Sequence, residues 1–189
     1  MNRKNRANVI VDSHANIDRL PASTARAPAS ARAGGRTVVL GIGNTLLADE
    51  GVGVHVVEAL RRAEAPAEGV EYVDGGTLSF GLAADLHGAG RLIVVDAAEL
   101  DAVPGTLRVL TGGAMDRFLT ERSRRSVHEV GLADLLQVLA LDDGLPPERA
   151  LVAIQPRRVD WGDTPTPEVA AAMPEACRAV RALIEGWTA

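Results

Sequence analysis

The sequence predicts an α/β protein: a three-layer sandwich in which a five-stranded, mostly parallel twisted sheet carries helices on both faces. Short runs of Val, Leu and Ile alternate with amphipathic stretches along most of the chain, which is typical of strands joined by helical crossovers. A glycine-rich turn at 41–53 joins the first apolar run to the first amphipathic stretch. Aromatic residues are only 3% of the chain and hydrophobic residues 47%, so Val, Leu, Ile and Ala must build the core.

Five apolar runs are expected to form the strands of the sheet. The run at 91–97 is continuous, which predicts a strand buried on both faces, and the run at 106–110 follows a Pro-Gly turn and is expected at an edge. Right-handed crossovers place the first strand between the second and the third. The expected strands are 37–42, 70–73, 91–97, 106–110 and 150–154.

The helices are predicted from apolar stripes and from capping residues. A helix starting at Val52 turns His55 away from its apolar face, so His55 is expected on the solvated surface. The segment 126–129 has the form of a capping box, which starts a helix at about Val127 with His128 in its first turn. Shorter helices are expected at 79–87 and 112–122, and Thr166-Pro167 begins the last helix, with Cys177 on its apolar stripe.

Composition divides the chain into two parts and excludes several classes of function. Residues 1–35 carry a net charge of +4 without a sustained period and are predicted to be a disordered tail, whereas residues 36–189 form a single α/β domain with a net charge of about −9. An acidic body argues against non-specific nucleic-acid binding. A single cysteine excludes an intrachain disulfide, and no apolar run is long enough for a membrane span. We therefore expect a cytoplasmic monomer.

Three carboxylates and a histidine are expected at one edge of the sheet. Glu50 follows the first strand, Asp74 the second, and Asp96 ends the third, so all three open where the strand order reverses. His128 begins a helix that reaches the same edge. Two carboxylates and a neutral imidazole suit a divalent transition metal with open positions, although these ligands do not separate zinc, nickel, manganese and iron. The alternative is that Glu50 and His128 are surface residues and Asp96 caps a loop.

A nucleotide site is a second interpretation of the same loop. Gly41-x-Gly43 begins like the dinucleotide fingerprint, and Asp74 ends the second strand as a ribose-binding acid would. However, Leu46 replaces the third glycine, and Asp49 and Glu50 would face a pyrophosphate with like charge. No Gly-x-Ser-x-Gly elbow indicates a serine hydrolase, so hydrolysis here needs a metal or carboxylates to activate water.

Five ordered motifs over about residues 37–187 resemble the nickel–iron hydrogenase maturation endopeptidases. They are Gly41-Ile-Gly-Asn44 with Asp49-Glu50-Gly-Val-Gly53, then Asp74-Gly-Gly-Thr77, Val95-Asp96-Ala97, His128-Glu-Val-Gly-Leu132 and Ile154-Gln155-Pro156. The resemblance implies an enzyme that removes a short C-terminal peptide from the nickel-loaded precursor of a hydrogenase large subunit. A non-cleaving nickel-checkpoint chaperone that binds the same precursor is the alternative.

The resemblance also implies roles for individual residues. Glu50, Asp96 and His128 would engage nickel supplied by the substrate, with other divalent metals as alternatives in the isolated protein. Asp49 and Asp74 match recurrent acidic positions, so Asp96, Asp74 and Asp49 are the candidate catalytic carboxylates of an aspartic-type protease. In one hypothesis nickel is only recognised and Asp96 or Asp74 acts as general base, and in the other the metal is a Lewis acid.

Apart from the resemblance, two surface features are candidate substrate contacts: Arg122, Arg124 and Arg125 before His128, and Arg157, Arg158 and Trp161 after the last strand. The alternative is solvated loop charge and ordinary packing of the tryptophan.

Overall fold

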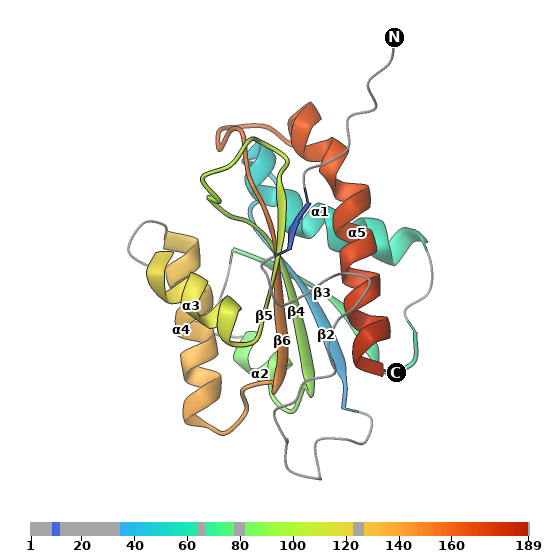
Figure 1. Ribbon diagram of the computed structural model, residues 1–189, viewed down its shortest axis with the longest axis vertical. Coiled ribbons are helices and arrows are strands. Elements are labelled where there is room, and N and C mark those ends of the chain that lie inside the picture. The colour runs from blue at the N-terminus through green and yellow to red at the C-terminus, as the bar shows by residue number, and fades with distance from the viewer. Residues whose placement is uncertain (1–8, 12–34, 64–66, 78–81, 123–126, 189) are drawn as a thin grey trace.

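The computed structural model describes residues 9–11, 35–63, 67–77, 82–122 and 127–188, with the backbone alone for residues 9–11, 122 and 127–130. The predicted three-layer α/β sandwich is confirmed, with the sheet in the middle (Figure 1). The strands are β1 (Val9–Val11), β2 (Thr37–Ile42), β3 (Val70–Gly76), β4 (Arg91–Ala97), β5 (Leu107–Thr111) and β6 (Glu148–Ile154). The helices are η2 (Ala48–Gly51), α1 (Val52–Ala63), α2 (Leu82–Leu86), α3 (Gly113–Arg122), α4 (Val127–Leu141) and α5 (Pro167–Thr188).

The strand order is β1-β5-β6-β4-β2-β3, and every neighbouring pair is parallel except β5 with β6. The prediction that the first strand of the domain lies between the next two is confirmed, because β2 pairs with both β3 and β4. β3 runs three residues beyond the predicted end at Val73, since the amide of Gly43 donates to the carbonyl of Gly76 at 2.9 Å and so extends the pairing.

A sixth strand, β1, corrects the predicted disordered tail at three residues. Val9–Val11 pairs in parallel with β5, whose outer edge would otherwise present unpaired backbone groups. A Val-Ile-Val run has high β propensity, which suits such an edge. The rest of the predicted tail, residues 1–8 and 12–34, lies outside the described residues.

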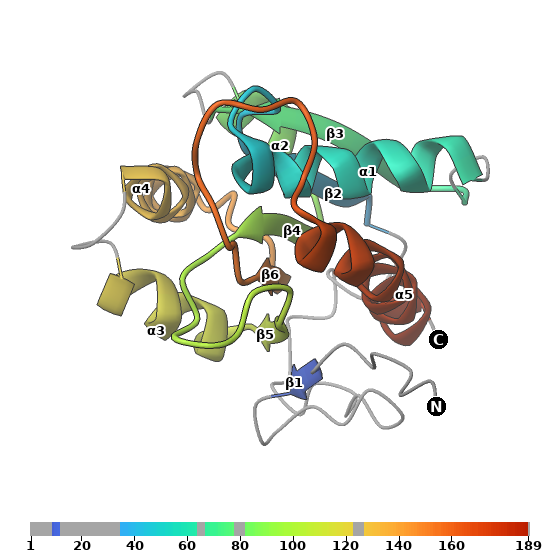
Figure 2. The ribbon, with the colours of Figure 1, turned by 90° about the horizontal axis from the view of Figure 1, so that it is seen from above.

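Helices cover both faces of the sheet, and each face has its own aliphatic core (Figure 2). α1 and α5 pack on one face against Val39, Ile93 and Val95, whereas α2, α3 and α4 pack on the other against Leu92 and Val94. Successive β4 residues therefore alternate between the two cores, as a strand buried on both sides requires. Within the described ranges, no helix combines the length and the apolar character that crossing a membrane would need.

Two glycines let the loop after β2 press against the end of β4. A Cβ on Gly53 would lie 2.1 Å from the carbonyl oxygen of Val95, and a Cβ on Gly43 would lie 1.9 Å from the carbonyl oxygen of Glu50. Gly43 also has a φ of +132°, a backbone conformation that residues with a side chain rarely adopt. These contacts bring η2, which carries Glu50, to the carboxyl end of the neighbouring strand.

Candidate functional site

Two buried carboxylates lie at the carboxyl edge of the sheet, one in η2 and one near the end of β4. Glu50 is 7% exposed in η2, and its Oε2 accepts a hydrogen bond from the backbone amide of Asn44. Asp96 is 3% exposed and follows Val95, whose carbonyl oxygen is approached by Gly53 in the first turn of α1. Acidic side chains are rarely buried to this degree in proteins, so this position is a strong candidate for a site.

The two aliphatic cores show which face of the sheet Asp96 lies on. Val95 belongs to the core beneath α1 and α5, and Val94 belongs to the core beneath α2, α3 and α4. Because side chains alternate along a strand, Asp96 faces the same side as Val94. Asp96 therefore lies on the face of the sheet that α4 covers.

α4 begins at Val127, which confirms the predicted helix start, and so His128 lies in its first turn. β5 is antiparallel to β6 and therefore runs away from the carboxyl edge of β4. α3 leads back towards that edge and α4 leads away from it, so the N-terminal end of α4 lies at the carboxyl edge (Figure 1). The imidazole of His128 lies outside the described side chains. Among those that are described, no three His, Cys, Asp or Glu residues gather into a metal-binding group.

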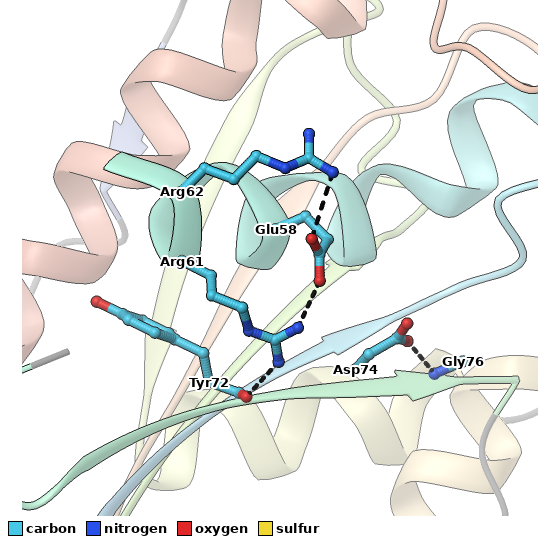
Figure 3. A network of polar contacts seen from close by, with 6 residues as sticks. All are labelled: Glu58, Arg61, Arg62, Tyr72, Asp74 and Gly76. Atoms are coloured by element: carbon cyan, nitrogen blue, oxygen red, sulfur yellow. Dashed lines mark hydrogen bonds and ion pairs between the residues drawn. The ribbon is translucent and has the colours of Figure 1, made fainter. Parts of the chain in front are cut away.

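Asp74 lies at the same edge but on the opposite face. It pairs with Gly41, which in turn pairs with Val95, so Asp74 faces the α1 side of the sheet. Figure 3 shows its carboxylate on the side of β3 that faces α1, with one oxygen accepting from the amide of Gly76 at 2.9 Å. The side chain is exposed. The structure therefore places η2, which carries Glu50, against β4, which carries Asp96, and it puts Asp74 and Asp96 on opposite faces of the sheet.

Asp74 lines a cavity of about 450 Å³ between the loop after β2, α1 and α5. His55 lines it as well and is only partly exposed, with an Nε2 that is buried and has no hydrogen-bond partner among the described residues. Burial and then the charge of Arg62 lower the pKa of His55, although Asp163 acts in the opposite direction. The prediction of a solvated surface histidine is wrong, because α5 and the loop before it cover this side of α1.

Asp49 is fully buried and accepts four hydrogen bonds from the segment 155–166, which we call the strap. Its Oδ2 accepts from the amides of Arg157 and Arg158 and from the hydroxyl of Thr166, each at 2.9 Å, and its Oδ1 accepts from the amide of Thr166 at 2.6 Å. Burial alone would raise the pKa of Asp49, but these hydrogen bonds outweigh it and lower the pKa. Both oxygens are therefore engaged in holding the strap.

The strap connects β6 to α5 and crosses the loop that carries Glu50 (Figure 2). Leu47 and Gly162 form a parallel bridge, in which the amide of Ala48 donates to the carbonyl of Gly162 at 2.7 Å. At its start, the buried Oε1 of Gln155 accepts from the amide of Leu100 at 2.6 Å. The sequence analysis assigned no helix or strand to the strap and did not predict its role. The only signals in the sequence were the motifs at 49–53 and 154–156, which contain Asp49 and Gln155.

Residues 54–182 match the model of a family described as hydrogenase maturation protease. Hydrogenase 2 maturation protease of Escherichia coli K12 is 37% identical over 136 residues, which cover 70% of this chain and 82% of the relative. The hydrogenase expression/formation protein HoxM of Azotobacter vinelandii is 37% identical over 142 residues, 75% of this chain and 68% of that protein.

Solved structures give the same result for the fold. The hydrogenase maturating endopeptidase HybD from Escherichia coli superposes with a TM-score of 0.74 at 35% identity, over 80% of this chain and 93% of that one. The HybD protease of Thermococcus kodakarensis superposes with a TM-score of 0.66 at 27% identity, over 78% and 98% of the two chains. The family model covers more than half of the chain and the relative from Escherichia coli is covered over most of its length, so this chain belongs to the hydrogenase maturation protease family.

Proposed function

We propose that this chain is an endopeptidase that removes a short C-terminal peptide from the nickel-loaded precursor of a nickel–iron hydrogenase large subunit. The observation that carries the proposal is that Glu50 and Asp96 are both buried on two elements in contact, η2 and β4, at the carboxyl edge of the sheet in a chain of this family. Nickel arrives as part of the substrate in this scheme. Glu50, Asp96 and His128 contact it there.

The donor set suits a metal that another protein already holds. Two carboxylates and one imidazole leave coordination positions open, and those positions can be filled by ligands of the precursor. A helix N-terminus favours the neutral imidazole over the imidazolium, which is the form that binds a metal. The carboxylates are buried beside a rigid loop, so little ordering is needed when the precursor docks.

We assign the three acidic candidates different tasks. Asp96 contacts nickel, Asp49 positions the strap, and Asp74 is the general base, because its side chain is exposed to solvent. In hydrolysis the water oxygen bonds to the scissile carbonyl carbon while its proton moves to Asp74. The C–N bond then breaks, and the amine of the released peptide takes that proton. β3 and β4 flank β2, so the Cα atoms of Asp74 and Asp96 are about 10 Å apart, and their side chains point to opposite faces of the sheet.

Cleavage is expected to depend on nickel in the precursor. Purified precursor should be prepared with and without nickel, incubated with the chain, and weighed by mass spectrometry. We expect a mass loss at the large subunit only in the nickel-loaded sample, since the buried carboxylates have no metal to bind in the other. Equal rates would contradict nickel recognition. Tight binding of the loaded precursor without any mass loss would instead identify a non-cleaving checkpoint protein.

Asp74→Asn is expected to lower the rate of cleavage by about 100-fold, the contribution typical of a general base, while nickel-dependent binding stays intact. The side chain is exposed, and the oxygen of Asn can accept the hydrogen bond that Asp74 accepts from the amide of Gly76. Glu71→Gln is the matched control, because it removes a negative charge from an exposed position of the same strand. Retention of full cleavage by Asp74→Asn would move the base elsewhere.

A further inference from the structure

The middle of the strap exposes large apolar side chains on a backbone that is held in place. Val159 is 57% exposed and Trp161 is 77% exposed. Asp49 accepts backbone hydrogen bonds on both sides of them, from Arg157 before and from Thr166 after. These side chains are therefore displayed by a fixed loop, and folding gains little from them.

A third exposed apolar residue lies next to Trp161 on the neighbouring loop. Leu46 is 56% exposed, and its carbonyl accepts from the amide of Gly162 at 3.0 Å. That bond belongs to the parallel bridge between Leu47 and Gly162, whose register places Leu46 beside Trp161. The docking surface, as we define it, consists of Leu46, Val159 and Trp161.

The arrangement is typical of a surface that binds a protein. Single exposed apolar residues are common, but neighbouring ones on one rigid edge mark interaction sites. Tryptophan is enriched among the residues that dominate binding energy, and a backbone fixed in advance lowers the entropic cost of association. Leu141, at the end of α4 and 89% exposed, is an exposed apolar residue without such a setting.

The position of the docking surface identifies its partner. The strap is hydrogen-bonded to Asp49, the residue that precedes Glu50, so the docking surface forms one rim of the candidate reaction site. A chain that enters the site over this rim must pass Leu46, which also lines the cavity that contains Asp74. A substrate segment on this path would cover the exposed side chains.

We infer that the docking surface binds an apolar segment of the hydrogenase large-subunit precursor next to the scissile bond. This inference rests on the proposed function for the identity of the substrate. The bonds to Asp49 and Gly162 set the distance between this contact and Glu50. The docking surface thereby determines which precursors are presented to the site.

The test compares Trp161→Ala with Leu141→Ala, a matched removal of an exposed apolar side chain far from the strap. Binding of nickel-loaded precursor is measured by biolayer interferometry, and cleavage by initial rates over a range of precursor concentrations. We expect Trp161→Ala to weaken binding and raise KM by about tenfold or more with kcat little changed, and Leu141→Ala to match the wild type. Melting temperatures of both variants should equal the wild-type value, because both side chains are exposed.

A photo-crosslinking residue at position 161 gives an independent readout, with position 141 as the control site. Crosslinks to the precursor from 161 alone would support the inference. Wild-type binding and cleavage by Trp161→Ala would overturn it and leave the proposed function standing. Binding of the precursor through Trp161 without any cleavage would support the inference and contradict the proposed function. If Trp161→Ala changes only self-association in size-exclusion chromatography, the surface joins copies of this chain and the inference fails.

Discussion

Asp96→Asn is expected to abolish cleavage of the precursor and its nickel-dependent binding together. Asp96 is 3% exposed at the end of a central strand, and the change to Asn keeps its size while removing the charge that a metal needs. The loss should exceed the roughly 10- to 100-fold effect of removing a residue that only supports a metal ligand. Glu50→Gln and His128→Ala should lose the same two properties.

The measurement pairs a cleavage assay with binding of loaded and unloaded precursor. Asp134→Asn is the matched control, because it neutralises an exposed Asp of α4 on the same side of the sheet. If Asp96→Asn still prefers the nickel-loaded precursor but no longer cuts it, Asp96 is the base and the metal contact lies elsewhere. A variant with wild-type binding and cleavage would remove Asp96 from the site.

Asp49→Ala is expected to lower the free energy of unfolding by about 3 kcal/mol or more, a large effect for a single substitution. The change removes the acceptor for three backbone amides and one hydroxyl, and it leaves a cavity where a fully buried side chain stood. Asp49→Asn should cost nearly as much, because its amide group would face at least one N–H donor. Urea unfolding followed by circular dichroism measures both variants.

The loss of stability caused by Asp49→Asn should also depend on pH, and the folded-state pKa of Asp49 determines the direction. The folded-state pKa of Asp49 is below the ordinary value of 3.8, so the charged form is bound more favourably in the folded protein. Its stabilisation is present above about pH 4 and is lost as the pH falls through the folded pKa. We expect the stability gap between wild type and Asp49→Asn to be constant from about pH 7 to pH 5 and to narrow below about pH 4. A gap that stays constant at acidic pH would contradict the assignment.

Local sequence patterns predicted the sheet and its switch point. The continuous apolar run at 91–97 is strand β4, and α4 does start at Val127, as the pattern at 126–129 predicted, although the expected cap Ser126 lies outside the described residues. Crossover rules then placed β2 between β3 and β4. Strand β1 was missed, because three apolar residues in a polar segment form a strand only when a sheet edge is there to pair with.

The glycine-rich loop at 41–53 was predictable as one wall of a site. Its glycines and paired acids are adjacent in the chain, so the sequence alone argued against a phosphate there. Parallel strands end at a common edge, which is why Glu50, Asp74 and Asp96 were expected together there. Sequence reasoning did not separate the two faces of that edge, which depend on the pairing of Asp74 with Gly41 and of Gly41 with Val95.

What the chain alone determined was therefore what depends on near neighbours and on connection rules: the five strands β2 to β6, the starts of α1, α4 and α5, the turn after β2 and the edge where the carboxylates lie. The tertiary structure decided the tasks of the acids, because their partners are distant in sequence. Asp49 binds residues 108, 109 and 117 positions away, and no local pattern indicates such pairs. Burial of both its oxygens assigns it to the strap, and the alternation of side chains along β4 turns Asp96 towards α4.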